Sequence, residues 1–180
     1  LRPDFVGARL HRGFLLLDQA RGAEAGADLD EVLAARPDHA AAASARLFAL
    51  NYRDDLGAAA VVAQHRAWGR AVAARIPILP AMGFDRDPER RLRVGYLSGD
   101  FRTHSVAYFL APLLAAHDRT RVEVVGYADV AAPDGMTARL RGDCDLWRDV
   151  HGMDDQAVAE QVRADGVDLL VDLAGHTAYN

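Results

Sequence analysis

Two short polar segments carry the residue types that could do chemistry in this chain. They are Thr103-His104-Ser105 and Gly175-His176-Thr177. Histidine exchanges a proton near neutral pH, so it suits general-base catalysis on an alcohol. Each histidine could instead cap a helix or hydrogen bond to the backbone of its own loop. The residues alone leave these interpretations open.

Two further groups bear on the chemistry. Asp100 precedes His104 by four residues and could orient the imidazole, or it could hydrogen bond to the backbone of its own turn, which is the commoner behaviour of aspartate there. Asp143-Cys144-Asp145 resembles a D-x-D metal motif, but no third ligand lies nearby in the sequence. Hard cations need more than two oxygen ligands. We therefore expect no metal site, and Cys144 as a small buried or edge residue.

A strand, a loop and a helix must position the first of these segments. Leu92 to Leu97 alternates apolar residues with the period of a strand. A turn-rich stretch follows, and then an apolar run from Val106 to Leu114 that Ser105 or Thr103 could cap as a helix. Pro112 lies inside that run and predicts a kink or an early end.

The rest of this half of the chain repeats the pattern. Further strands are predicted at residues 122–127, 146–150 and 167–173, and helices at residues 136–141 and 154–165. The last strand is almost continuously apolar, as expected for a strand buried on both faces. Alternating strands and helices predict a doubly wound parallel sheet, in which ligands bind at the carboxyl ends of the strands. Both histidine segments follow strands, so we expect them at one edge of the sheet.

Composition and missing motifs narrow the function. The net charge of −5 argues against a surface that tracks nucleic-acid phosphates, and the absence of lysine excludes Schiff-base lysine chemistry in this chain. Gly95 and Gly99 do not form a dinucleotide-binding fingerprint, and no phosphate-loop motif is present. A single cysteine fits a reducing compartment, and no apolar run is long enough for a membrane span. We expect a cytoplasmic protein with no nucleic-acid or membrane partner. Because Leu1 is not an initiator methionine, we expect a piece of a longer protein.

Residues 3 to 76 predict a separate, all-helical region. Part of it fits a tetratricopeptide repeat, with Gly13 and Leu16 at the packing positions of a first helix and residues 22–25 as the turn into a second. The early aromatic residue of such repeats is absent, so an ordinary helical hairpin ended by Pro37 is the alternative. We place the helical segment at residues 1–84, a polar linker at 85–91 and the sheet domain at 92–180.

Two blocks of the sheet domain resemble the catalytic region of the O-GlcNAc transferase and SPINDLY family. The first is RRLRVGYLSGDF (residues 90–101), continued by Thr103-His104-Ser105 and Tyr108-Phe109. The second is VDLLVDLAGHT, at residues 167–177. Enzymes of this family carry tetratricopeptide repeats before the catalytic part, which fits the helical region.

The resemblance implies a fold and an activity. The expected fold is a tetratricopeptide-like helical segment followed by the doubly wound N-terminal lobe of a GT-B glycosyltransferase, cut before the nucleotide-binding lobe. The expected activity is metal-independent, inverting transfer of a sugar from a nucleotide diphosphate to Ser or Thr hydroxyls of proteins, without a cofactor. The alternative is a repeat-based interaction scaffold with an inactive transferase-like domain.

The resemblance also implies roles for individual residues. His104 matches the family's active-site histidine, as a base or as an acceptor-site contact. We expect the residues beside it to bind substrate, together with the second polar segment; these are Asp100, Thr103, Ser105, Gly175, His176 and Thr177. The Gly-His-Thr segment is nearer to SPINDLY, which uses GDP-fucose, whereas its relatives use UDP-GlcNAc, so both donors are open. The helical repeats would bind the acceptor proteins. We expect residues 1–180 alone to bind nucleotide sugar weakly and not to turn over.

Overall fold

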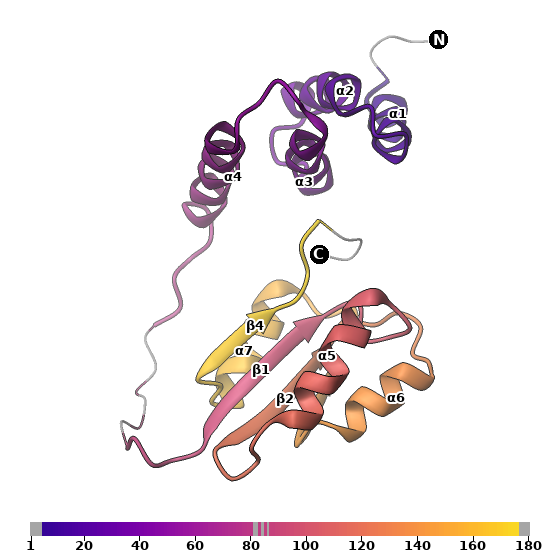
Figure 1. The fold of residues 1–180 in the computed structure, drawn as a ribbon. Coiled ribbons are helices and arrows are strands. Elements are labelled where there is room, and N and C mark those ends of the chain that lie inside the picture. Colours follow the sequence, from indigo (N-terminus) through magenta and orange to yellow (C-terminus); the bar gives the residue numbers. More distant parts are fainter. Residues whose placement is uncertain (1–4, 81–82, 84, 86, 177–180) are drawn as a thin grey trace. The chain divides into compact units, whose positions relative to one another are not determined.

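The computed structural model describes residues 5–80, 83, 85 and 87–176. The chain divides into two compact units, Leu1–Leu79 and Pro80–Asn180. The first unit is helical and the second is built on a parallel sheet (Figure 1). No helix among the described residues is both long and apolar enough to cross a bilayer.

The helical unit contains the helices that the sequence predicts. They are α1 (Val6–Asp18), α2 (Gly22–Ala35), α3 (Ala40–Ala49), a 3₁₀ turn (Leu50–Tyr52) and α4 (Ala58–Ala73). Its core is made by α1, α2 and α3, and the largest fully buried side chain in it is Leu29. Gly13 of α1 lies so close to α2 that a β-carbon there would meet Leu29 at 3.0 Å. The small residue therefore allows the close approach of the two helices.

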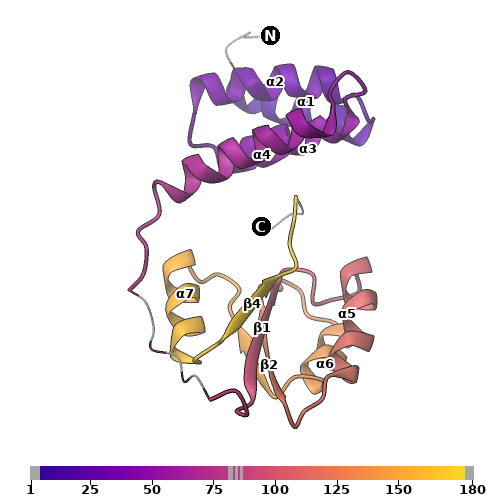
Figure 2. The same cartoon turned by 60° about the vertical axis from the view of Figure 1, so that its left-hand side comes forward.

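The second unit is a four-stranded sheet with helices on both faces. The strands are β1 (Leu92–Ser98), β2 (Val122–Ala128), β3 (Leu146–Asp149) and β4 (Leu169–Asp172); the helices are α5 (Ser105–Ala116), α6 (Gly135–Gly142) and α7 (Asp155–Ala164). The spatial order is β3-β2-β1-β4, and every pair is parallel. Helices α5 and α6 cover one face and α7 covers the other (Figure 2). This is the doubly wound parallel sheet that the sequence predicts.

Alternate residues of β2 supply the two cores of this unit. Val124 packs with the residues of α5 and α6, whereas Val125 and Tyr127 pack with those of α7. All three side chains are fully buried. Period-two burial of this kind is what a central strand between two helical layers requires.

The strand order reverses at β1. The chain moves from β1 outward to β2 and β3, and then returns to add β4 on the other side of β1. Ligands of open α/β sheets bind outside the carboxyl ends of the strands at such a reversal. A ligand site in this unit is therefore expected at the loops that leave β1 and β4.

Strand β4 differs from its predicted burial. Its three apolar residues Leu169, Leu170 and Val171 are 55%, 48% and 37% exposed, although the sequence predicts a strand buried on both faces. The reason is its place in the sheet: β4 is an edge strand that pairs only with β1 among the described residues. The apolar residues of a strand show that it prefers apolar surroundings. They do not show whether a second strand lies beside it.

Helix α5 does not end early at its proline. The early end that Pro112 allowed is wrong, since the helix continues four residues beyond it and ends at Ala116. Proline removes one backbone hydrogen bond within a helix. Leu114, in the last turn, is only 1% exposed and belongs to the core under α5. Burial of this side chain offsets the lost hydrogen bond and keeps the last turn helical.

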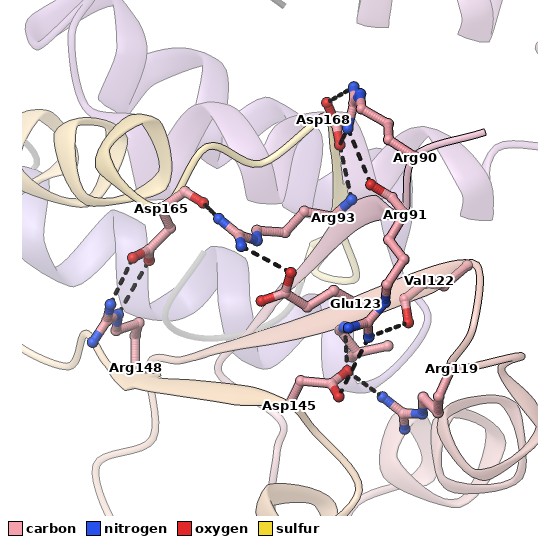
Figure 3. A network of polar contacts seen from close by, with 11 residues as sticks. Arg90, Arg91, Arg93, Arg119, Val122, Glu123, Asp145, Arg148, Asp165 and Asp168 are labelled. Carbon is pink, nitrogen blue, oxygen red and sulfur yellow. Dashed lines mark hydrogen bonds and ion pairs between the residues drawn. The ribbon is translucent and has the colours of Figure 1, made fainter. Parts of the chain in front are cut away.

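Ion pairs tie the amino ends of the strands together (Figure 3). Asp168, just before β4, accepts from both terminal nitrogens of Arg90 at 2.7 and 2.5 Å and from the backbone N–H of Arg93 at 2.8 Å. Asp145, just before β3, accepts from Arg119 and from the backbone N–H of Val124, each at 2.7 Å. These carboxylates fix the register of neighbouring strands at the edge opposite the candidate site.

A third carboxylate, Asp165, lies between α7 and the sheet. It accepts from the Tyr127 hydroxyl at 2.9 Å and from Arg148 at 2.6 Å. The hydrogen bond from Arg148 is the main cause that lowers its pKa. The same contacts affect the phenol in the opposite direction, since burial and the nearby carboxylate raise the pKa of Tyr127 well above its ordinary value.

The three carboxylates predict acid sensitivity of the sheet unit. The pKa of Asp168 is lowered mainly by Arg90; burial alone would raise the pKa of Asp145, but the Val124 amide and Arg119 outweigh it and lower the pKa. With Asp165, three folded-state pKa values thus lie below the ordinary value of about 3.9, so the unfolded chain binds more protons near pH 4. The resulting stabilisation is complete above about pH 5 and is lost as the pH falls through the folded pKa values.

Urea unfolding followed by circular dichroism at pH 7, 5, 4 and 3 would measure this effect. We expect a constant urea midpoint down to about pH 5 and a fall below pH 4. The Asp168→Asn variant should unfold at a lower urea midpoint at pH 7, and its midpoint should fall less between pH 5 and pH 3. A midpoint that does not change between pH 5 and pH 3 would contradict the prediction.

Candidate active site at the carboxyl ends of β1 and β4

The loop that leaves β1 is anchored by buried side chains. Ser98 is 1% exposed, and its hydroxyl oxygen accepts from the backbone N–H of Asp100 at 2.9 Å. Phe101 is also 1% exposed and packs against Trp147, with 5.4 Å between the ring centroids. The loop is therefore fixed at both Ser98 and Phe101, and it presents the next residues from a rigid base.

His104 is the N-cap of α5. Its backbone is extended, with φ −153° and ψ 157°, and its Nδ1 accepts from the backbone N–H of Val106 at 3.3 Å. The expectation that Ser105 or Thr103 caps this helix is wrong, since Ser105 is already the first helical residue. Ser, Thr, Asp and Asn are the preferred N-cap residues, so N-cap propensity favoured Thr103 and Ser105 over His104.

Asp100 lies beneath His104 and is 4% exposed. Its carboxylate lies 3.5 Å from His104 Nδ1 and 3.6 Å from the Arg102 guanidinium. The sequence allowed the Asp100 carboxylate to hydrogen bond to the backbone of its own turn. In the structure the turn is held instead by the backbone N–H of Asp100, which donates to the Ser98 hydroxyl. The carboxylate instead faces the imidazole, as the first interpretation of this residue expects.

Thr103 is held from α6, by a residue that the sequence reasoning did not select. Its backbone N–H donates to Asp134 Oδ2 at 2.7 Å. Asp134 also caps α6 by accepting from the backbone N–H groups of Met136 and Thr137, and the Thr137 hydroxyl oxygen in return accepts from the backbone N–H of Asp134 at 3.0 Å. The hydrogen bond from Thr103 is the main cause that holds the pKa of Asp134 well below its usual range. The spacing of Asp134 and Thr137 could have indicated the capping box from the sequence. The contact between Asp134 and Thr103 could be found only from the folded structure.

Removing this carboxylate is expected to loosen the loop without unfolding the sheet. In Asp134→Ala both the α6 cap and the contact with Thr103 are lost, whereas Asp154→Ala removes only a cap, that of α7. We expect faster amide hydrogen exchange at Thr103 and His104 in Asp134→Ala and unchanged exchange there in Asp154→Ala. Equal exchange at Thr103 in the two variants would contradict this role.

The second polar segment starts beside the first. Leu97 of β1 pairs with Asp172 of β4, and the Leu173 N–H donates to the Leu97 carbonyl at 3.0 Å. The expectation that both loops lie at one edge of the sheet is therefore confirmed. Gly175 and His176 follow on an exposed stretch, and Thr177 lies outside the described residues.

A cavity of about 410 Å³ opens at the same edge, between α7 and the ends of β1 and β4. The neighbours of the predicted residues line it: Gly99 precedes Asp100, and Ala174 precedes Gly175. Apolar side chains of α7 form much of the wall, and the lining includes Asp129, Asp155 and Asp172, of which Asp129 contacts His151 at 2.6 Å. Carboxylates accept hydrogen bonds from hydroxyl groups and repel phosphate, so this cavity suits a hydroxylated group better than a diphosphate.

The D-x-D segment is structural. Asp145 is paired with Arg119 and Arg91, and Cys144 is partly buried beside Gly126. Burial raises the pKa of the Cys144 thiol to about 11, which makes it a poor nucleophile and a poor metal ligand near neutral pH. Among the described residues, no three His, Cys, Asp or Glu side chains are grouped to hold a metal ion.

The chain is similar to known glycosyltransferases. The family model of glycosyl transferase family 41 matches residues 71–179. A tomato protein described as a probable UDP-N-acetylglucosamine–peptide N-acetylglucosaminyltransferase SPINDLY is 40% identical over 148 residues, which cover 80% of this chain and 16% of the relative. A peptide N-acetylglucosaminyltransferase of Caenorhabditis elegans is 31% identical over 106 residues.

A solved structure gives the same result for the fold. The K341M mutant of the Thermobaculum terrenum O-GlcNAc transferase matches with a TM-score of 0.89 and 38% identity, over 97% of this chain and 34% of that one. The fold class predicted from the sequence, a helical segment followed by a sheet lobe of a GT-B glycosyltransferase, is thereby confirmed. The chain spans about a sixth of the curated relatives and a third of the solved one. On the family match and these identities, the chain belongs to glycosyl transferase family 41.

Proposed function

We propose that this chain is part of a protein O-glycosyltransferase, which transfers a sugar from a nucleotide diphosphate to Ser or Thr hydroxyls with inversion. The observation that carries the proposal is the position of His104. It stands on an anchored loop at the strand reversal, in the half of the chain that the family match covers. The relatives' descriptions name a peptide as acceptor, which supports a protein substrate.

The residues of the sheet unit favour binding of the acceptor over binding of the nucleotide diphosphate. The cavity beside the loops carries carboxylates, so it does not suit the diphosphate of a nucleotide sugar. Diphosphate needs cations and helix N-termini. We propose that these groups lie in a nucleotide-binding lobe outside residues 1–180, and that this chain contributes the acceptor side through His104, Asp100, Thr103 and Ser105, with Gly175, His176 and Thr177. The isolated chain should then bind nucleotide sugar weakly and show no turnover.

The helical unit fits a role in binding acceptor proteins. Antiparallel helices in close contact at Gly13 and Leu29 are typical of tetratricopeptide repeats. We propose that these helices belong to such a repeat array and recognise acceptor proteins. A cytoplasmic location is proposed on the single cysteine, Cys144, which suits a reducing compartment.

The test uses the full-length parent protein with an extract of acceptor proteins. Incubation with UDP-GlcNAc or GDP-fucose, followed by mass spectrometry of Ser and Thr peptides, identifies the donor from the added mass. We expect a hexosamine or a deoxyhexose on the acceptors, and a loss of product in His104→Ala. Absence of product with both donors would overturn the proposal and favour the scaffold function.

A further inference from the structure

The hydrogen bonds of His104 indicate which of its ring nitrogens carries the proton. Within the described part of the chain, both of its polar contacts are made through Nδ1, at 3.3 Å from the Val106 nitrogen and 3.5 Å from Asp100 Oδ2. The two neighbours require opposite protonation states of Nδ1. The Val106 amide is a donor and requires a bare Nδ1, whereas the Asp100 carboxylate is an acceptor and requires Nδ1–H.

The amide is the better placed of the two. The contact with Val106 is a hydrogen bond in distance and angle, and it satisfies one of the N–H groups at the start of α5, which otherwise have no partner within the helix. The separation from Asp100 is longer than the usual range of a charge-assisted hydrogen bond. A neutral imidazole carries one ring proton, so a bare Nδ1 leaves that proton on Nε2.

We infer that His104 presents an N–H group at Nε2 to the bound substrates and serves as a hydrogen-bond donor, not as the general base. This inference rests on the proposed glycosyltransferase function. A base needs a free electron pair on the nitrogen that faces the acceptor hydroxyl, and the N-cap bond uses the pair on Nδ1 while Nε2 holds the proton. A fixed N–H on the acceptor side can donate to the oxygen of the acceptor hydroxyl and hold it for attack, and the proton of that hydroxyl then passes to a base other than His104.

Another histidine of the chain provides an internal reference. His39 caps α3 in the same way, since its Nδ1 accepts from the Ala42 N–H at 3.3 Å. Ion pairs among the described residues include a carboxylate at His104 and none at His39. His39 therefore shows what an N-capping imidazole does without a nearby aspartate.

Long-range ¹H–¹⁵N NMR on the ¹⁵N-histidine-labelled chain reads the tautomer without any need for activity. At about pH 8.5 an ordinary imidazole is neutral, and the two ring nitrogens resonate far apart according to which one carries hydrogen. The His104→Asn variant assigns the His104 signals among the seven histidines. We expect an unprotonated Nδ1 and a protonated Nε2 for both His104 and His39. A protonated Nδ1 at His104 would overturn the inference.

Three substitutions in the parent protein separate donor from base. His104→Gln keeps an amide N–H near the position of Nε2, but an amide cannot act as a base. His104→Asn keeps the cap, because Asn is a preferred N-cap residue, but its shorter side chain does not reach that position. His104→Ala loses both. We expect turnover to fall by about 10²–10³ in Ala and Asn, and Gln to stay at least about tenfold above both.

The control on folding is the melting temperature. His104→Asn should melt at or above His104→Ala, so a low activity of the Asn variant cannot be assigned to a lost cap. Equal inactivity of Gln, Asn and Ala, with Gln still folded, would overturn the donor role in favour of a base. An inactive parent protein would overturn the proposed function and leave the tautomer to the NMR result, so the two failures are distinguishable.

Discussion

Replacing Phe101 with alanine is expected to lower the free energy of unfolding of the sheet unit by about 3–5 kcal/mol. Phe101 is among the largest fully buried side chains, and it fills the space between the β1 loop and Trp147. Its loss leaves a cavity in the core under α5. Because the ring also anchors the loop that carries Asp100 and His104, we expect the transferase activity of the parent protein to fall even where the variant stays folded.

Urea or thermal unfolding measures the first effect, and product formation at a temperature below the melting point measures the second. Phe109→Ala is a matched control, since the same atoms are removed from a side chain that is 81% exposed. Its free energy of unfolding should change by less than about 0.5 kcal/mol. If Phe101→Ala were no less stable than Phe109→Ala, the packing described for the loop would be wrong.

Gly126→Ala is expected to cost about 1–3 kcal/mol of stability although it adds a single methyl group. A β-carbon at this position of β2 would lie 2.6 Å from Cε3 of Trp147 and 3.2 Å from the Cys144 sulfur. The Trp147 ring is partly buried and packs against the core, so it cannot move aside as the end of a flexible side chain can. Trp147 would have to shift, and with it the face against which Phe101 packs.

The matched control for this change is Gly135→Ala. No heavy atom lies within 4 Å of a β-carbon built at Gly135, the first residue of α6, and alanine favours helix there. Both variants add one methyl group to a glycine, in a crowded strand position at Gly126 and in open space at the start of a helix at Gly135. Urea midpoints should therefore be reduced for Gly126→Ala and unchanged or slightly raised for Gly135→Ala; a stable Gly126→Ala would show that β2 and β3 are less tightly packed than described.

Much of this architecture could be predicted because the pattern of apolar residues is local. Period-two alternation at Leu92 to Leu97 and the following helical run gave the strand, the loop and the helix, and the alternation of elements gave the parallel sheet. The common edge of the two polar loops followed from the parallel arrangement. Burial of β4 could not be predicted in this way, since it depends on the sheet neighbours and not on the residues of the strand itself.

The candidate site was predictable in its location and not in its bonding. Propensity alone favours Ser105 or Thr103 as the cap of α5, whereas the extended backbone at His104 gives the capping position to the imidazole. Asp134 holds Thr103 across 31 residues of sequence, so no local pattern could connect them. The carboxylates around the cavity, Asp129 and Asp172, end or follow strands, which is the signal that could have found them.

The exposed edge of β4 has a consequence for self-association. In residues 1–180 taken alone, β4 has one partner strand among the described residues and three exposed apolar side chains, and such an edge is a template for pairing with another copy of the chain. Two aspartates flank those residues, Asp168 before them and Asp172 after them, in the manner of gatekeepers. Antiparallel pairing of two β4 strands centred on Leu170 would place Asp168 of one copy opposite Asp172 of the other. Arg90 already neutralises Asp168, so Asp172 of the other copy would meet little repulsion there, and the short length of β4 is the main limit on what such a pairing could gain.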